Sequence, residues 1–209
     1  WSPDSRYVAL SRPDSTRGLA QIVLCEVASG RKAVVSTDRY ESGSPAFSRD
    51  GQWLYFLSNR TFVSTNAGPW GDRNTGAFFD RRTRIYALAL QPGLRFPFLV
   101  RNELLPAVAK EIEEKAIVKN KPKGDTKDKP AKVGPLPNVV FEGLSERLFE
   151  VPLPAGNYSD LAIDDARLYW LERDTALATK QQLKTLAIDA NNPEPELFTA
   201  DAQSFALSA

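Results

Sequence analysis

The stretch FSRDGQWLYF, residues 47–56, belongs to a short pattern that recurs along the chain and decides the fold. The pattern also occurs as WSPDSRYVAL at residues 1–10 and, in a shorter form, as IDDARLYW at residues 163–170. In each copy a short polar turn leads into a strand-like apolar stretch. The Asp-Gly dipeptide of the 47–56 copy is among the strongest signals for a tight hairpin. These repeated hairpins indicate a chain built from equivalent β units.

The spacing of the copies is typical of a propeller blade. Trp1 and Phe47 are 46 residues apart, and a partial fourth copy places Leu207 44 residues after Ile163. Four-stranded blades repeat every ~40–50 residues. Because a blade buries its apolar faces only against neighbouring blades, we predict an all-β fold, a partial β-propeller of about three four-stranded blades that belongs to a larger ring.

Further strands are expected between the hairpins, where aromatic and β-branched residues alternate and Gly, Pro or Asn follow. The expected strands are 21–27, 32–36, 43–48, 53–58, 84–90, 183–189 and 196–199.

The chain divides into three parts. Propeller blades are expected at 1–103, a helical and disordered linker insert at 104–138, and a further blade with the start of the next at 139–209. Residues 119–132 hold six Lys, two Asp and two Pro with Ala131 as the only apolar residue. Such a segment cannot bury apolar surface and is predicted to be disordered. No aromatic residue is interleaved for base stacking, so we interpret it as a solvated linker rather than a nucleic-acid site.

The composition excludes several kinds of chemistry. The chain contains no His, so it cannot hold a Ser-His-Asp site or a His-ligated metal. We predict no catalytic, cofactor-binding or metal-ligating residue in it, and no cofactor. The acidic pair Asp164-Asp165 occupies the turn of its repeat. Cys25, the single Cys, follows an apolar run and is predicted to be a buried thiol. The net charge of +1 gives no reason to expect nucleic acid, and no apolar run suits a membrane span.

The connection 59–83 is the candidate functional surface. It is far longer than the ~2–5 residues of most hairpin loops and carries four aromatic residues, Phe62, Trp70, Phe78 and Phe79. Two interpretations remain open. The aromatic side chains pack onto their own blade or form an extended hairpin that covers a neighbour. Alternatively, they meet another domain or subunit, or line the path of a peptide, because aromatic anchors dominate interfaces.

Three longer strings carry a resemblance to a known family. They are SPAFSRDGQWLYFLSNR at 44–60, RFPFL at 95–99, and FEGLSER at 141–147 running into VPLPAGNY at 151–158. Together with the Lys-rich insert between the last two, they make most of the chain resemble the second β-propeller of tricorn-type proteases.

The resemblance implies a parent protein with two propellers, a PDZ domain and a serine-peptidase core of the tail-specific type. None of that core's catalytic residues falls in this chain. The propeller is then expected to gate or scaffold access of peptide substrates, in a homo-oligomer located in the cytoplasm or, alternatively, the periplasm. Two other origins share the repeat: the propeller of a prolyl-oligopeptidase-like serine hydrolase, and a TolB-like protein-binding module without an enzyme attached.

Overall fold

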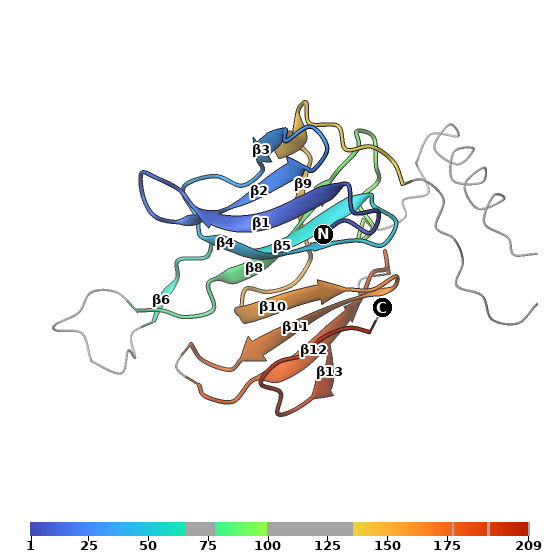
Figure 1. Ribbon diagram of the computed structural model, residues 1–209. Coiled ribbons are helices and arrows are strands. Elements are labelled where there is room, and N and C mark those ends of the chain that lie inside the picture. Colours follow the sequence, from blue (N-terminus) through green and yellow to red (C-terminus); the bar gives the residue numbers. More distant parts are fainter. Residues whose placement is uncertain (66–77, 100–135, 177, 192, 209) are drawn as a thin grey trace, which may run out of the picture.

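The computed structural model describes residues 1–65, 78–99, 136–176, 178–191 and 193–208, and in them three antiparallel sheets form successive blades (Figure 1). The all-β prediction is confirmed. Blade A contains β1 (Tyr7–Pro13), β2 (Ala20–Glu26) and β3 (Lys32–Val34). Blade B contains β4 (Ser42–Phe47), β5 (Trp53–Asn59), β8 (Thr83–Ala89) and β9 (Leu148–Glu150). Blade C contains β10 (Asn157–Ile163), β11 (Arg167–Arg173), β12 (Gln182–Ala187) and β13 (Glu196–Thr199). A short hairpin of β6 (Ser64–Thr65) and β7 (Phe78–Phe79) interrupts blade B, and a 3₁₀ turn spans Leu144–Glu146.

The repeated sequence pattern forms the hairpin turn that leads into the second strand of a blade. In blade B the Ser48 hydroxyl accepts a hydrogen bond from the Trp53 N–H at 2.9 Å. In blade A the Ser2 hydroxyl accepts the Tyr7 N–H at the same distance. Gly51 has a φ of 66°, the left-handed region that glycine enters without steric cost. The turn therefore depends on a small hydroxyl at its start and a residue that tolerates positive φ.

The third copy of the turn is two residues shorter than the turn of blade B, and it uses a carboxylate. Asp164 Oδ1 accepts hydrogen bonds from the N–H groups of Ala166 at 2.8 Å and Arg167 at 2.7 Å. This confirms the predicted turn role of Asp164. The longer Asp side chain reaches the backbone of a tighter turn, so the hairpin is preserved although the turn is two residues shorter.

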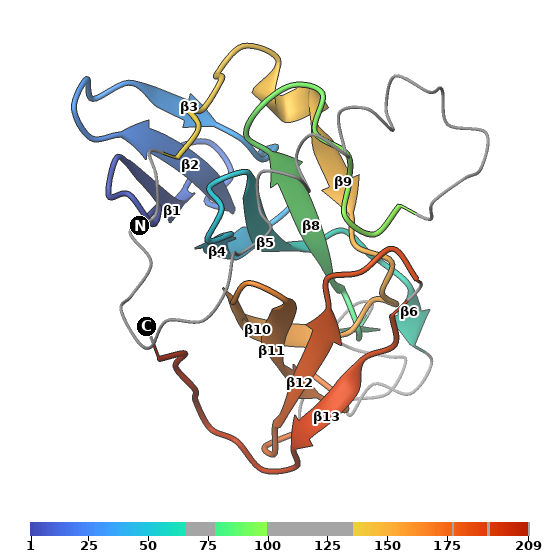
Figure 2. The same cartoon turned by 90° about the vertical axis from the view of Figure 1, so that its right-hand side faces the viewer.

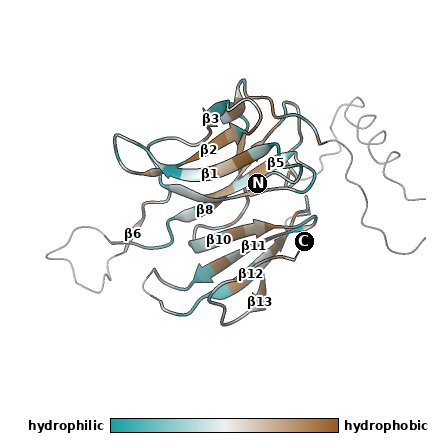
Figure 3. Cartoon of the chain, viewed as in Figure 1, coloured by the Kyte–Doolittle hydropathy of each residue, from teal (hydrophilic) through white to brown (hydrophobic). Residues whose placement is uncertain are grey.

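Blade B is apolar on both faces because it lies between two other blades. Leu54 and Phe56 of β5 point toward blade A, whereas Trp53, Tyr55 and Leu57 point toward blade C. This arrangement follows from the two-residue period of a strand. Figure 3 shows hydrophobic stretches on strands of all three blades.

Two cores result, one at each joint. The core between blades A and B contains Tyr7, Ile22, Leu24, Val35, Phe47, Leu54, Phe56, Tyr86, Leu88, Leu90, Val139 and Leu144. The core between blades B and C contains Trp53, Tyr55, Leu57, Ile85, Ala87, Ala89, Phe98, Val151, Leu153, Tyr158, Leu161, Leu168, Trp170 and Leu186.

The insert divides blade B between its third and fourth strands. β9 pairs with β8, with Ala87 opposite Phe149, so the segment that follows the insert first completes blade B and only then begins blade C. Residues 100–135, including the predicted disordered 119–132, lie outside the described residues. At the start of the next described range, the carbonyl oxygen of Leu136 accepts a hydrogen bond from Arg6 at 2.6 Å.

Blade A differs from the predicted four-stranded unit. Its β1 is equivalent to β5 and β11, because it follows the same hairpin turn, and among the described residues β1 pairs with β2 alone. Blade A therefore has three strands. The prediction of a buried Cys25 is wrong: the side chain is half-buried and lies on the face of β2 opposite to Ile22 and Leu24, which form the core with blade B.

Candidate functional site

The structure describes two of the four predicted aromatic side chains. Phe62 precedes β6 and is 52% exposed, and Phe79 lies in β7 and is half-buried. The backbone of Phe78 pairs with Thr65 in the hairpin. The side chain of Phe78 and all of Trp70 lie outside the described residues. Figure 1 shows β6 extending from the body of the blades, on the side where β5 ends.

The two described aromatic rings pack with a third, which comes from a different segment. Phe79 meets Phe62 edge-on, with ring centroids 5.7 Å apart. Phe62 stacks on Tyr40, just before β4, at 6.0 Å. Sequence reasoning did not single out Tyr40, because it precedes an ordinary strand and shares no pattern with the long connection. We call Tyr40, Arg60, Phe62 and Phe79 the aromatic surface.

Arg60 connects this surface to the core between blades A and B. Its guanidinium lies 4.0 Å from the ring centroid of Tyr86 and 5.4 Å from that of Tyr40. Its Nε donates a hydrogen bond to Ser58 Oγ at 3.1 Å. Tyr86 in turn stacks on the fully buried Phe56 at 6.0 Å. Cation–π contacts stabilise such packing, so these contacts link the base of the long connection to the core between blades A and B.

The environment of Tyr86 is polar on its outer side. Its hydroxyl donates to Glu150 Oε2 at 3.0 Å, and Glu150 also pairs with Arg84. Burial, followed by this hydrogen bond, raises the pKa of Tyr86 to about 12. Tyr86 therefore stays neutral at physiological pH and acts as a hydrogen-bond donor to Glu150.

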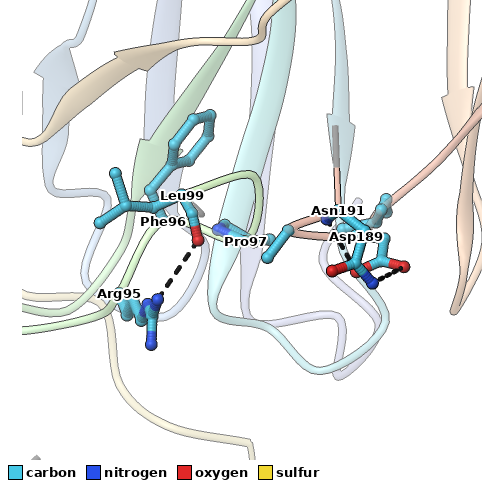
Figure 4. A pocket seen from close by; sticks show the side chains of 8 residues that line it. Arg95, Phe96, Pro97, Leu99, Asp189 and Asn191 are labelled. Carbon is cyan, nitrogen blue, oxygen red and sulfur yellow. Dashed lines mark hydrogen bonds between the residues drawn. The ribbon is translucent and has the colours of Figure 1, made fainter. Parts of the chain in front are cut away.

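A pocket of about 480 Å³ lies between blades B and C. It is lined by Arg95, Phe96, Pro97, Leu99, Ile188, Asp189, Ala190 and Asn191. Figure 4 shows Arg95 and Asp189 on opposite sides of it; Arg95 donates to the carbonyl oxygen of Leu99 at 3.3 Å, and Asn191 Nδ2 donates to Asp189 at 3.0 Å. The pocket combines the 95–99 string with the turn between β12 and β13, which the sequence alone did not bring together.

A group of hydrogen bonds connects blades B and C at the end of their joint opposite to the pocket. Asp80 Oδ1 accepts hydrogen bonds from Asn157 Nδ2 at 2.9 Å and from the Ala176 N–H at 2.8 Å. Asn157 Oδ1 accepts the Arg81 N–H at 3.0 Å. Asp80 lies near the end of the long connection 59–83, so these bonds join that connection to blade C. No residue pattern in the sequence predicted these hydrogen bonds.

Acidic, Cys and Ser side chains of the described residues are the remaining candidates for metal or covalent chemistry. Within the ranges that the structure covers, no group of three or more acidic or Cys side chains is placed to bind a metal ion. Ser42 and Ser58 share a buried hydrogen bond of 2.9 Å, and the Ser58 hydroxyl also accepts a hydrogen bond from Arg60 Nε at 3.1 Å, a guanidinium that donates rather than accepts a proton. Among the same residues no helix has the length and apolarity needed to cross a membrane.

The amino-acid sequence of this chain is similar to those of two known proteins. A Streptomyces coelicolor protein described as tricorn protease homolog 2 is 29% identical over 203 residues, and tricorn protease homolog 1 of the same organism is 27% identical over 171 residues. The chain is a tricorn-like β-propeller segment. It spans 16% and 14% of the lengths of these relatives. No protein-family model matches it.

Solved structures agree on the fold. The crystal structure of the tricorn protease superposes with a TM-score of 0.67 at 15% identity, over 99% of this chain and 18% of that one. A structure from Agrobacterium tumefaciens described as a TolB superposes with a TM-score of 0.51 at 11% identity, over 96% of this chain and 49% of that one. The tricorn-like segment therefore has the propeller fold that its repeats predict.

Proposed function

We propose that this chain is a non-catalytic segment of the second β-propeller of a tricorn-like serine protease, where it gates or scaffolds the access of peptides to a catalytic core. The observation that carries the proposal is the match to a tricorn protease homolog over 203 residues, together with the three-blade fold. The absence of His from the chain supports a non-catalytic role.

The innermost strands provide the surface for gating. Blades surround a central channel, and the first strand of each blade lies closest to it. β4 and β10 each carry an irregularity at the same place, with Ser44 at a φ of 50° and Asp160 at 52°. Positive φ is strained in residues other than glycine. These two bulges set the shape of the inner wall, and the exposed carboxylate of Asp160 adds negative charge to the innermost strand.

The aromatic surface is the proposed contact with a partner. Arg60 and Tyr86 anchor it to the core, while the half-exposed Phe62 remains available. Rigid, partly exposed aromatic side chains are typical anchors of interfaces. The partners would be the PDZ domain and catalytic core of the same polypeptide, a further subunit of a homo-oligomer, or the peptide substrate. The compartment would be the cytoplasm or, alternatively, the periplasm.

The fold likeness to a TolB favours a second candidate, a protein-binding propeller with no enzyme attached. The two candidates differ in what the complete polypeptide contains. A serine-peptidase core on the same polypeptide supports the protease, and its absence supports the binding module.

The test compares peptidase activity of two purified proteins, the complete polypeptide and the 209-residue chain. Fluorogenic peptides of several sequences and lengths are offered to both. We expect cleavage by the complete polypeptide only, and a change in its preference for peptide length when Asp160 is replaced by Lys. Turnover that follows the 209-residue chain through repurification, or a complete polypeptide without activity, would contradict the proposal.

A further inference from the structure

The pocket between blades B and C is built from two segments that lie far apart in the sequence. One is the loop 95–99, which follows β8, and the other is the turn 188–191, which lies between β12 and β13. Figure 2 shows the loop just above this turn. The pocket volume of about 480 Å³ is within the ~300–1,000 Å³ that is typical of small-molecule sites.

The aromatic wall of the pocket is fixed by the side chains behind it. Phe96 stacks on Phe149, with ring centroids 5.0 Å apart and an angle of 10° between the ring planes. Phe96 also packs against Trp53 at 5.9 Å and Phe98 at 5.4 Å. The Leu99 N–H donates to the Phe96 carbonyl at 3.0 Å, which closes the loop as a turn. The wall therefore has its shape before a ligand binds, and such preorganisation favours binding.

The facing turn is held by hydrogen bonds of its own. The Ile188 N–H donates to the Ala166 carbonyl at 2.7 Å, so the turn is attached to the neighbouring hairpin of blade C. Asp189 Oδ1 accepts the Asn191 N–H at 3.2 Å, and Asp189 Oδ2 accepts Asn191 Nδ2 at 3.0 Å. These bonds orient the carboxylate, and each of its oxygens can accept more than one hydrogen bond.

Groups of opposite charge flank the pocket on its two sides (Figure 4). The half-buried Arg95 lies on the loop side, where its bond to the Leu99 carbonyl orients the guanidinium, and the exposed Asp189 lies on the turn side. A guanidinium matches the geometry of a carboxylate, and a carboxylate accepts hydrogen bonds from an ammonium group. A ligand that uses both sides therefore has a carboxylate at one end and an ammonium group at the other.

The rest of the lining has apolar side chains. Phe96, Pro97 and Leu99 come from the loop, and Ile188 and Ala190 come from the turn. Leu99 is 53% exposed, so a ligand that covers it removes apolar surface from water. An inorganic ion would leave this surface uncovered. The lining thus favours an organic ligand with an apolar body between its charged ends.

We propose that this pocket binds a small zwitterion with an apolar body, which is an amino acid or a short peptide with both ends free. The ligand carboxylate pairs with the Arg95 guanidinium, the ligand ammonium group pairs with the Asp189 carboxylate, and an apolar side chain packs on Phe96. The site needs only the joint between blades B and C, so it does not depend on the proposed protease function.

The test is calorimetric titration of the 209-residue chain with leucine and with the dipeptide Ala-Leu. The dipeptide is offered with both ends free, with an acetylated N-terminus, with an amidated C-terminus, and with both ends capped. We expect a free-ended ligand to bind, and capping of either end to weaken binding about tenfold or more, because it removes one charge-assisted contact. Tighter binding of leucine identifies an amino-acid site, and tighter binding of Ala-Leu identifies a peptide site. No binding of either free-ended ligand at millimolar concentration, or equal binding of free and capped forms, would overturn the proposal.

Two variants assign the ends of the ligand. Arg95→Gln should abolish the preference for a free over an amidated C-terminus, and Asp189→Asn should abolish the preference for a free over an acetylated N-terminus. Arg39→Gln and Asp201→Asn are the matched controls, because both residues are exposed and neither lines the pocket. Misfolding would weaken all ligands alike, whereas loss of preference at one end alone reports a lost contact. Preferences that survive in both pocket variants would contradict the assigned contacts.

Discussion

Two hydrogen bonds join Ser48 and Trp53 across the base of the blade B turn. The Ser48 hydroxyl accepts the Trp53 N–H at 2.9 Å, and the Ser48 N–H donates to the Trp53 carbonyl at 2.9 Å. Ser2 and Tyr7 make the same two bonds in blade A, at 2.9 and 2.8 Å. This paired bonding explains why the repeat keeps a hydroxyl five residues before an aromatic strand start. Without it, the buried N–H of Trp53 would have no partner in the turn.

Ser48→Ala should destabilise the chain by about 1–3 kcal/mol, the cost of leaving a buried donor unsatisfied. Chemical denaturation of the two proteins measures the difference in free energy of unfolding. Ser145→Ala serves as the control, because Ser145 is exposed in the 3₁₀ turn. Equal stability of the Ser48 and Ser145 variants would show that the hydroxyl is dispensable.

Asp164 should make stability depend on pH in the acid range. Burial alone would raise the pKa of Asp164, but hydrogen bonds from Ala166, Tyr169 and Arg167 together hold it below its ordinary value of 3.8. A carboxylate with a lowered folded-state pKa contributes stability that is complete above the unfolded pKa and is lost as the pH falls through the folded pKa.

We therefore expect Asp164→Asn to cost about 1–2 kcal/mol at pH 7, and the difference from the parent to shrink below pH 4. Urea denaturation at pH 7, 5 and 3 measures it. Asn keeps an acceptor for the turn but has no charge, so the variant isolates the ionic contribution. A difference that stays constant down to pH 3 would contradict this account.

Trp170 should tolerate loss of its N–H far better than loss of its ring. It is fully buried between blades B and C and meets Tyr158 edge-on at 5.7 Å. Its Nε1 has no hydrogen-bond partner among the described residues. Trp170→Ala should cost about 3–5 kcal/mol because it opens a large cavity. Trp170→Phe should cost less than half as much, and similar losses in the two thermal melts would refute the distinction.

Substitution of aromatic residues in the long connection 59–83 should affect function more than stability. In the complete polypeptide, Trp70→Ser combined with Phe79→Ser is expected to change peptide cleavage or assembly, with the melting temperature almost unchanged. Tyr86→Phe is the structural comparison, because it removes only a hydrogen bond to Glu150. A large loss of stability with normal specific activity in the folded fraction would show that these aromatics merely pack on their own blade.

Much of the local structure was predictable because its causes are local. The Asp50-Gly51 turn, the alternation along β5 and the Asp164 turn each depend on residues within a few positions of one another. The strand expected at 196–199 is observed with those bounds, and the others shift by one or two residues. The site was less predictable. Phe62 and Phe79 were singled out by the length of their connection, but Tyr40 and Arg60 were not, because only the fold places them together.

By itself, the sequence determined the all-β class, the repeating hairpins and the absence of His chemistry, since these follow from residue type and short-range spacing. Only the tertiary structure decided that β9 completes blade B after the insert, that Asp80 joins the long connection to blade C by hydrogen bonds, and that Cys25 is half-buried. The physical reason is that strand pairing and blade packing bring together residues more than 50 positions apart, as with Ala87 and Phe149, and no local preference specifies which partners meet.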